Sequence, residues 1–259
     1  MTALVAIRCK DGVVIGADSS ATLGDGAHTR TIEQRTEKKI SIVGNTNKII
    51  VAGTGYVGHH QRFVHQVSLE NAKKGFENKH ETEVATLLSQ VGIRDFSQTM
   101  LPDHLRSIQY SALVAYKANN KTCLCELFGA LGFQPEIKPL DDLWFTSMGS
   151  GQPITDSVLS LFRSVFWENE APDVNGGIFT AYWALQHACD VNPGGVNFPI
   201  KIAVYGKRNN SLDAWLLSDD EVRETADLVV AAKEHFAGFR DELLGKSGTK
   251  KIPPPPVGL

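Results

Sequence analysis

A threonine lies directly behind the initiator methionine, at the start of the stretch MTALVAIRCKDGVVIGADSSAT. Initiator methionine is readily removed before small residues, and its removal would give Thr2 a free α-amino group beside its hydroxyl. The hydroxyl is a poor nucleophile alone, but the α-amino group of the same residue can act as its base. The ordinary pKa of that amine is about 7.7–8.0, so it can accept a proton near neutral pH. A nearby lysine ammonium would favour the neutral amine and stabilise a developing alkoxide.

Five short patterns downstream hold residue types that could complete such a site. In chain order they are GADSSAT, EKKIS, VAGTG, SMGSG and ACDVNPGG. Taken singly, each has an ordinary structural explanation: Asp18 could end a strand, Lys39 could be a surface lysine, and Ser150 could cap a helix. A threonine in second place is also common. The patterns gain meaning from their shared order along the chain.

This ordered set resembles the proteasome β-type subunits and the bacterial protease subunit HslV, which are N-terminal-nucleophile hydrolases. The resemblance extends to about residue 218. It implies that Thr2 is the nucleophile, that Asp18 is the acidic residue of the site, and that Lys39 is the catalytic lysine. It further implies that the Gly53 amide forms the oxyanion hole. The spacing from Lys39 to Gly53 agrees with the family.

The same resemblance places two further residues beside the N-terminal amine. Ser150 corresponds to the serine of the family's Gly-Ser-Gly turn, and Asp190 corresponds to an aspartate that precedes a double glycine. Many relatives have a serine just before that double glycine, where this chain has Pro193, which lacks a hydroxyl. The loop between Asp18 and Lys39 is longer than in typical members, and a long final helix follows. These departures favour the bacterial proteasome homologue of betaproteobacteria over HslV, with Anbu as the second candidate.

Each residue type suits the role that the resemblance implies. Asp18 can hold Lys39 charged and oriented through a charge-assisted hydrogen bond, and Lys39 can lower the proton affinity of the Thr2 hydroxyl. A backbone N–H at Gly53 can stabilise a tetrahedral oxyanion, and loss of such a donor typically costs about 2.7–4 kcal/mol of transition-state stabilisation. Glycine at that position also allows the substrate backbone to approach closely.

The family pattern also predicts residues that contact the substrate. Val51, two residues before the oxyanion glycine, and Ala21 are predicted to line the first specificity pocket. Gly55 is also predicted to bind the substrate. Because Val51 and Ala21 are apolar, we expect an apolar residue before the scissile bond. Glu37 can also reach this pocket, where its carboxylate would admit a basic residue instead.

The elements that must position these residues alternate between hairpins and helices. Apolar and β-branched runs separated by turn residues predict strands at 3–9, 13–18, 38–43, 48–55, 107–117, 121–129, 143–149, 198–206 and 211–218. Helices are predicted at 56–76, 81–101, 153–166, 177–191 and 218–245, and residues 19–37 are expected to form a polar loop. Because hairpins dominate, we expect two mainly antiparallel sheets packed face to face and covered by helices. This is an α+β fold, a four-layer αββα sandwich of the N-terminal-nucleophile hydrolase type.

The chain is expected to form one proteasome β-type domain over residues 1–245. Ser218 and Glu221 form a capping box at the start of the last helix, and Gly245 lies where a helix stop belongs. Residues 246–259 contain the run PPPP, which cannot be helical and favours an extended polyproline conformation.

The composition is that of an ordinary globular protein. The 259 residues carry a formal net charge of −3 and are 42% hydrophobic, which suffices for a large core and argues against nucleic-acid binding. The first 16 residues lack a secretory signal, and no stretch is long and apolar enough to span a bilayer. Cys9, Cys123, Cys125 and Cys189 are expected to be buried free thiols, so the reducing cytoplasm is the expected location.

Neither a cofactor nor a metal is expected. Cys123 and Cys125 share one face of a strand, but the second cluster that a zinc site needs is missing from the sequence. His59 and His60 are adjacent, so on a helix they point about 100° apart. No ligand lies one helical turn beyond His60.

The resemblance implies a self-compartmentalising threonine endopeptidase that hydrolyses peptide bonds of unfolded proteins or peptides. It implies stacked rings, most simply a heptameric double ring, with a ring-shaped unfoldase as a further partner and with neither nucleic acid nor membrane. Three alternatives stay open: an inactive structural ring subunit, a small-molecule amidase of the same fold, and a Gly-Ser-Gly phosphate loop. The last lacks the lysine and the further glycines that such a loop needs.

Overall fold

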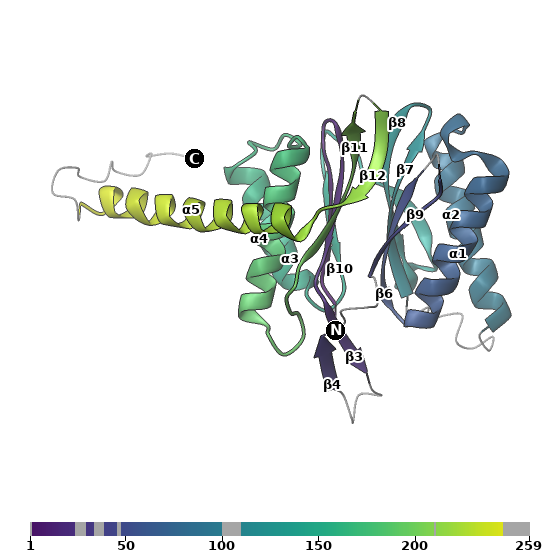
Figure 1. The fold of residues 1–259 in the computed structure, drawn as a ribbon, viewed down its shortest axis with the longest axis horizontal. Helices are drawn as coiled ribbons and strands as arrows, with labels where there is room; N and C mark the ends of the chain where they lie inside the picture. The colour runs from purple at the N-terminus through teal and green to yellow at the C-terminus, as the bar shows by residue number, and fades with distance from the viewer. Residues whose placement is uncertain are drawn as a thin grey trace, which may run out of the picture.

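Two five-stranded antiparallel sheets lie face to face in the computed structural model, and helices cover the outer face of each (Figure 1). The structure describes residues 2–23, 30–33, 39–45, 48–99, 110–209 and 211–245. The arrangement confirms the expected α+β fold of four αββα layers. The predicted tail at 246–259 lies outside the described residues.

The first sheet carries the start of the chain. Its strand order is β10-β1-β2-β11-β12, and these strands span Phe145–Met148, Leu4–Arg8, Gly12–Ala17, Lys201–Arg208 and Ser211–Leu216. Every residue of β1 and β2 is buried. Both strands are covered on two faces, by the second sheet and by helices, which explains why they are apolar except for Arg8 at the end of β1.

The second sheet carries the lysine and glycine patterns. Its order is β5-β6-β7-β8-β9, and these strands span Ile40–Val43, Ile49–Gly55, Tyr110–Ala118, Lys121–Phe128 and Gln134–Ile137. Its outer face is covered by α1 and α2, at Val57–Lys74 and Glu81–Thr99, and that of the first sheet by α3 and α4, at Gln152–Val165 and Val174–Val191 (Figure 1). Two short 3-10 helices, η1 and η3, span Phe76–Asn78 and Gly129–Leu131.

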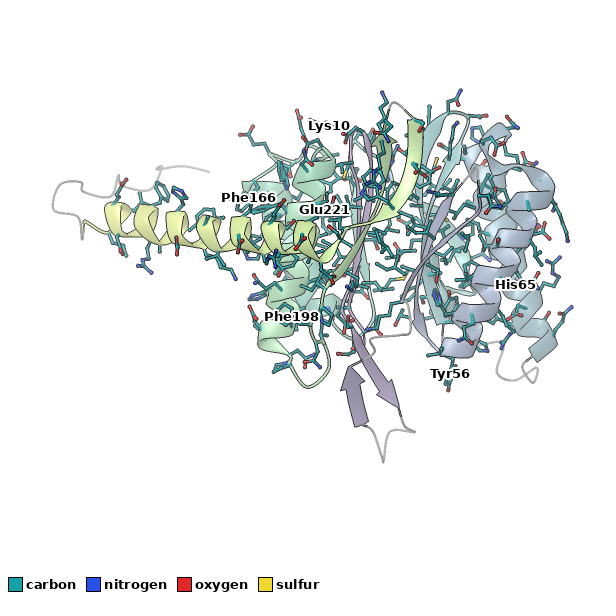
Figure 2. All side chains as sticks on the ribbon, viewed as in Figure 1. Lys10, Tyr56, His65, Phe166, Phe198 and Glu221 are labelled. Carbon is teal, nitrogen blue, oxygen red and sulfur yellow. The ribbon has the colours of Figure 1, made fainter. Side chains whose placement is uncertain are left out.

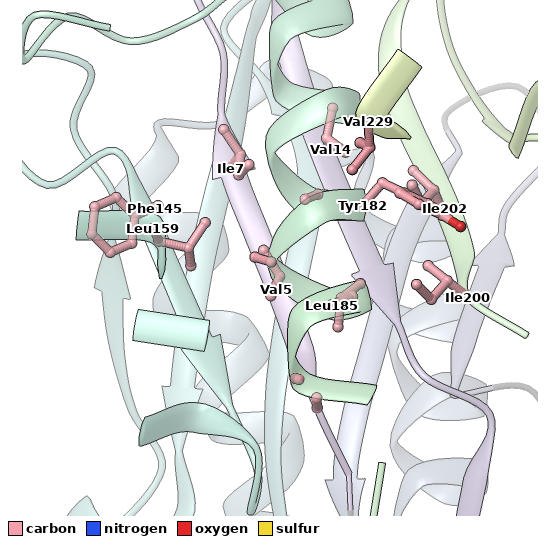
Figure 3. Packing of buried hydrophobic residues seen from close by; sticks show 14 of the residues in the cluster. Val5, Ile7, Val14, Phe145, Leu159, Tyr182, Leu185, Ile200, Ile202 and Val229 are labelled. Carbon is pink, nitrogen blue, oxygen red and sulfur yellow. The ribbon is translucent and has the colours of Figure 1, made fainter. Parts of the chain in front are cut away.

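Alternate residues of β1 belong to different cores, because successive side chains of a strand point to opposite faces. Val5 and Ile7 share a core with Leu185 of α4 (Figure 3). Leu4 and Ala6 belong to the core between the two sheets. A third core, between the second sheet and its helices, is rich in aromatic side chains, which include Phe63, Phe96, Tyr110 and Phe133.

Two parts of the chain differ from the sequence prediction. β3 (Ser20–Leu23) and β4 (Arg30–Glu33) pair as a two-stranded sheet that projects from the sandwich (Figure 1), where a polar loop was predicted. Glycines and polar residues hide the alternation of this hairpin. The strand β9 was also not predicted, because it is short, polar and contains Pro135, which is tolerated at a sheet edge.

The last helix, α5 (Asp219–Leu243), begins with the predicted capping box. Ser218 Oγ accepts the Glu221 N–H at 3.2 Å, and the Glu221 carboxylate accepts the Ser218 N–H at 2.6 Å. Glu221 marks the end of α5 that joins the body, whereas the other half of the helix extends away from it (Figures 1 and 2). Val229 packs into the core beside α4, but Phe239 on the extending half is 57% exposed.

Candidate active site

Thr2 lies against the turn that follows β10. Its backbone N–H donates to Ser150 Oγ at 3.1 Å, and its carbonyl accepts the Gly151 N–H at 3.1 Å. Gly149 has a φ of +92°, and a Cβ there would lie 2.9 Å from the Thr2 carbonyl carbon and closer still to its oxygen. Only glycine fits at this position, so the Gly-Ser-Gly pattern is explained by the close approach of the chain's start.

Hydrogen bonds of buried hydroxyl groups connect the strand before this turn to the helix after it. Ser147, the third residue of β10, donates its hydroxyl to the Asp156 carboxylate. Thr155 donates to Ser147 Oγ at 2.8 Å and also lies 3.2 Å from the Gly151 carbonyl. Ser147 and Thr155 are buried, so these bonds satisfy groups that water cannot reach. The first turn of α3 is thereby tied to the strand that leads into Ser150.

Asp18 is the most connected side chain of the site. Its Oδ1 accepts the Ala3 N–H at 2.9 Å and forms an ion pair with Lys39 Nζ, while its Oδ2 accepts the Ser20 N–H at 2.9 Å. The Asn197 N–H lies 3.3 Å from the same Oδ2. The Asp18 side chain is fully buried, and a buried carboxylate requires such donors to remain charged. The structure therefore brings Asp18 and Lys39 together, next to the residue that follows Thr2.

Lys39 lies immediately before β5, with its side chain 11% exposed. Burial lowers the pKa of its ammonium, and the negative charge of Asp18 acts in the opposite direction. The net effect is a lowered pKa, so the Lys39 ammonium gives up its proton more readily than a lysine in water.

Gly53 is buried near the end of β6, and its N–H already has a partner. It donates to the Lys39 carbonyl at 3.1 Å. The sequence led us to expect an amide available to an oxyanion. In this structure the amide is occupied, so it can serve an oxyanion only by exchanging that partner or by sharing its proton.

The other predicted site residues are not equally close to Thr2. Ser150 contacts its backbone nitrogen, as expected from the family pattern. Asp190 is exposed in the last turn of α4, and within the described ranges no hydrogen bond joins it to Thr2 or Ser150. Pro193 is exposed in the turn that follows. The loop after α4 approaches the site further on, where Val196 would lie 3.3 Å from a Cβ on Gly151.

The predicted substrate-binding residues lie at different depths. Val51 is fully buried in the core under α1 and α2, so its side chain forms no open pocket in this structure. Gly55 is exposed at the end of β6 with a φ of +112°. Ala21 is the second residue of β3, and Glu37 lies outside the described residues.

Two residues near the site were missed by sequence reasoning. Asn197 donates its N–H to Asp18, accepts the Ser19 N–H at 2.9 Å and donates its side-chain amide to Ser20 Oγ at 3.0 Å. Most of these contacts use the backbone of Asn197, which residues of every type have. The residue type at this position therefore did not point to a role in the site. The Cys189 thiol is buried near the same ion pair. Burial, together with the charge of Asp18, raises its pKa to about 12.

All four cysteines are buried free thiols, as predicted. In the part of the chain that the structure describes, no group of three His, Cys, Asp or Glu residues is arranged to hold a metal ion. None of the helices described is long and apolar enough to cross a membrane. His59 lies between the rings of Tyr56 and Phe96 at the start of α1, and His60 bonds to Tyr110.

Two antiparallel sheets between helical layers, with the start of the chain on a strand beside a Gly-Ser-Gly turn, define the fold of the N-terminal-nucleophile hydrolases. This chain matches a protein-family model, described as "Proteasome subunit", over residues 2–160. Because this match covers more than half of the chain, the protein belongs to the proteasome family.

Solved structures of Anbu proteins share this fold. A Gly-1 mutant of Anbu from Hyphomicrobium sp. strain MC1 has a TM-score of 0.65 and 15% identity, over 98% of this chain and 100% of that one. The helical assembly of the Anbu complex from Pseudomonas aeruginosa has a TM-score of 0.66 and 16% identity, over 98% of both chains. Anbu from Yersinia bercovieri, described as an ancestral beta-subunit, has a TM-score of 0.63 and 15% identity, over 99% of this chain and 100% of that one. At these identities the similarity shows a common fold.

Proposed function

We propose that this chain is a threonine endopeptidase subunit that hydrolyses peptide bonds of unfolded proteins or peptides, with Thr2 as its nucleophile once Met1 is removed. One observation carries the proposal, namely the continuous path of contacts through the site. The path runs from Ser150 to the Thr2 nitrogen, through Ala3 to the Asp18 carboxylate, and on to Lys39. A threonine hydroxyl needs a base and a stabilising cation, and this path links the Thr2 nitrogen to the Lys39 ammonium through Ala3 and Asp18.

In the proposed reaction, removal of Met1 turns the Thr2 nitrogen into a free amine held by Ser150. That amine accepts the hydroxyl proton while Oγ1 attacks the peptide carbonyl, which forms a tetrahedral oxyanion. The intermediate collapses as the amine gives the proton to the leaving nitrogen, the C–N bond breaks, and an ester remains on Thr2. Water then hydrolyses the ester through the same proton transfers, and the free hydroxyl is restored.

Lys39 and Gly53 stabilise the charges that this sequence creates. The Lys39 ammonium lowers the proton affinity of the Thr2 hydroxyl, and Asp18 holds that ammonium in place. The Gly53 N–H exchanges the Lys39 carbonyl for the oxyanion. Asp190 acts at longer range on the amine. Ala21, Glu37, Val51 and Gly55 contact the substrate, with an apolar residue preferred before the scissile bond.

Assembly of the chain with copies of itself follows from its family and is supported by α5. The apolar side of α5 that packs at Val229 continues to Phe236, which contacts Phe166 of the same chain, and then to Phe239 and Leu243 beyond the body. Large exposed apolar side chains on a projecting helix indicate an interface. We propose stacked rings, most simply a heptameric double ring, to which a ring-shaped unfoldase would deliver substrate.

The remaining features fit this proposal. Residues 1–245 would form one proteasome β-type domain and residues 246–259 an extended tail. The working compartment would be the cytoplasm, where four buried thiols remain reduced.

One observation favours an inactive structural subunit as the second candidate. The Gly53 N–H is bonded to Lys39, and Val51 is buried, so neither the oxyanion donor nor the pocket is open in this structure. An inactive subunit would assemble normally and fail to react at Thr2. A small-molecule amidase would react at Thr2 without forming rings.

The decisive experiment measures the N-terminal residue and its reactivity. Mass spectrometry of the purified chain should show Thr2 at the N-terminus, and a peptide epoxyketone should label that residue. Thr2→Ala should abolish labelling and the cleavage of fluorogenic peptides, while Thr86→Ala, an exposed threonine on α2, should change neither. An intact Met1, or labelling that survives Thr2→Ala, would defeat the proposal, and electron microscopy of the same sample separates a ring from a simple dimer.

A further inference from the structure

Gly53 is enclosed on the side that faces α1. A Cβ at this position would lie 2.7 Å from both Cε2 and Oη of Tyr110, and closer still to His60 Nδ1. Real Cβ atoms do not approach other atoms this closely, so the lack of a side chain lets the two groups contact the Gly53 backbone directly. His60 belongs to the first turn of α1, and Tyr110 is the first residue of β7.

The two groups that contact Gly53 are joined to each other. His60 Nδ1 and Tyr110 Oη share a hydrogen bond of 3.0 Å. Tyr110 is buried, and burial raises the pKa of its hydroxyl, which therefore stays protonated. Its ring stacks on Phe133 and meets the ring of Phe63 edge to face. The aromatic core thus fixes the hydroxyl that holds His60.

Within the sheet, Gly53 is flanked on its two edges by backbone groups of neighbouring segments. In the β6–β7 pair, Gly53 stands opposite Ala112, so one edge is held by the sheet. On the other edge its N–H donates to the Lys39 carbonyl at 3.1 Å. A new partner of the Gly53 N–H would have to replace the Lys39 carbonyl on that second edge. His60 and Tyr110 contact Gly53 on a different side, the one that faces α1.

We propose that His60 and Tyr110 are positioning residues for the Gly53 amide, a role that rests on the proposed function of that amide as oxyanion donor. The hydrogen-bonded pair keeps the N–H aimed at the oxyanion when the Lys39 carbonyl gives way. An oxyanion donor must lie about 2.7–3.1 Å from the oxygen that it stabilises. A displacement of about 1 Å caused by a change elsewhere can cost roughly 100-fold in rate.

A positioning role has a specific kinetic signature. The oxyanion exists only in the transition states and tetrahedral intermediates, so a displaced Gly53 amide lowers kcat and leaves KM nearly unchanged. A peptide boronate bonds to the Thr2 hydroxyl and places a boronate oxygen where the oxyanion would lie. Its affinity should therefore fall by a similar factor. A merely structural role would lower the unfolding temperature without this selectivity.

The Tyr110→Phe variant removes the hydroxyl and keeps the ring. Tyr116→Phe is a matched control, because Tyr116 is buried on the same strand and its hydroxyl donates to the Glu81 carbonyl at 2.9 Å. We expect Tyr110→Phe to lower kcat about 10- to 100-fold, to change KM less than about twofold and to raise the boronate Ki comparably. Tyr116→Phe should change none of these values. Equal behaviour of the two variants would overturn the proposal.

His60 supplies a second test, which stays informative if Tyr110→Phe does not assemble. Asparagine places a polar atom near the position of the histidine Nδ1, so His60→Asn should retain most of kcat. His60→Leu cannot hydrogen bond to Tyr110 and should lose kcat as Tyr110→Phe does. An equal loss in both His60 variants would show that the hydrogen bond is not the feature that matters.

Amide hydrogen exchange of a peptide that contains Gly53 tests the positioning without needing activity. Exchange should be faster in Tyr110→Phe than in the wild type and in Tyr116→Phe. A wild-type protein that neither cleaves peptides nor binds the boronate would refute the proposed function, and exchange would still decide the role of the pair. Unchanged exchange and kcat in Tyr110→Phe of an active enzyme would refute the positioning role alone.

Discussion

The carbonyl oxygen of Lys39 accepts the backbone N–H of Gly53 at 3.1 Å, while the ammonium of the same lysine is paired with Asp18. One residue therefore holds both the charge that would activate the proposed nucleophile and the carbonyl that occupies the proposed oxyanion donor. In the proposed mechanism, the Lys39 carbonyl would have to move away from the Gly53 N–H while the ion pair with Asp18 stays intact.

Loss of the Asp18 charge should destabilise the fold strongly. Asp18→Asn leaves the buried Lys39 ammonium without a counter-charge, and breaking a buried pair in this way costs about 3–5 kcal/mol. Urea unfolding measures the change. Glu83→Gln, which removes the exposed partner of Lys79, is the control and should cost less than about 1 kcal/mol. A similar small loss for both variants would show that the Asp18 pair is not essential.

Lys39 should make stability and activity respond to pH in opposite directions. Burial lowers its pKa from the usual 10.5. Between the lowered value and 10.5 the unfolded chain binds more protons than the folded chain, so the free energy of unfolding rises with pH through this group. Over the same range the folded site loses its ammonium, so kcat falls. The wild-type free energy minus that of Lys39→Met should rise with pH, and a flat difference would contradict the assignment.

A side chain at Gly149 should disrupt the seat of Thr2. Gly149→Ala combines a φ of +92° with a collision against the Thr2 carbonyl, whereas Gly132→Ala has a φ of +71° and no atom within 4 Å. The control should cost about 1–2 kcal/mol for its backbone conformation alone. Gly149→Ala should cost a further ~1–3 kcal/mol and should also abolish epoxyketone labelling. Thermal unfolding and intact-mass measurement of both variants decide the matter.

The exposed face of α5 should contribute to self-association. Phe239→Ser replaces a ring that is 57% exposed on the projecting half of the helix, and we expect the dissociation constant of the assembly to rise about tenfold, which is about 1.4 kcal/mol. Leu131→Ser is the control, since Leu131 is 69% exposed in η3 on another part of the surface. Sedimentation velocity compares the two. No shift for Phe239→Ser would exclude this face from the interface.

Much of the fold could be predicted because the central strands are buried on both faces. β1 is apolar from Leu4 to Ile7, β2 is apolar throughout, and an Asp-Gly turn joins them, so local pattern alone identifies the hairpin. β3 and β4 could not be predicted in this way, since each has only four residues, about half of them polar, and the stretch between them contains Gly24 and Gly26. β9 escaped because Pro135 in an edge strand is indistinguishable from a turn signal.

The site was predictable where side-chain type decides the contact and unpredictable where the backbone does. The meeting of Asp18 and Lys39 was expected from the family resemblance, and it suits the chemistry of a buried carboxylate, which is stabilised by a nearby ammonium. The bond from Gly53 to Lys39 depends on the register of β5 and β6, which residue type does not reveal. The support that Asn197 gives to Asp18 comes through its backbone N–H, for the same reason. The depth of Val51 is a property of tertiary packing.

The four groups that donate hydrogen bonds to Asp18 also determine at which stage of folding the site can form. Ala3, Ser20 and Lys39 come from the N-terminal part of the sequence, but Asn197 is 179 positions away from Asp18. Contacts of such long separation form late, because closing large loops costs chain entropy before the contact repays it. A nascent or half-folded chain would therefore lack the complete set of donors to Asp18. Under the proposed mechanism, Thr2 would become reactive only after the loop that carries Asn197 has docked.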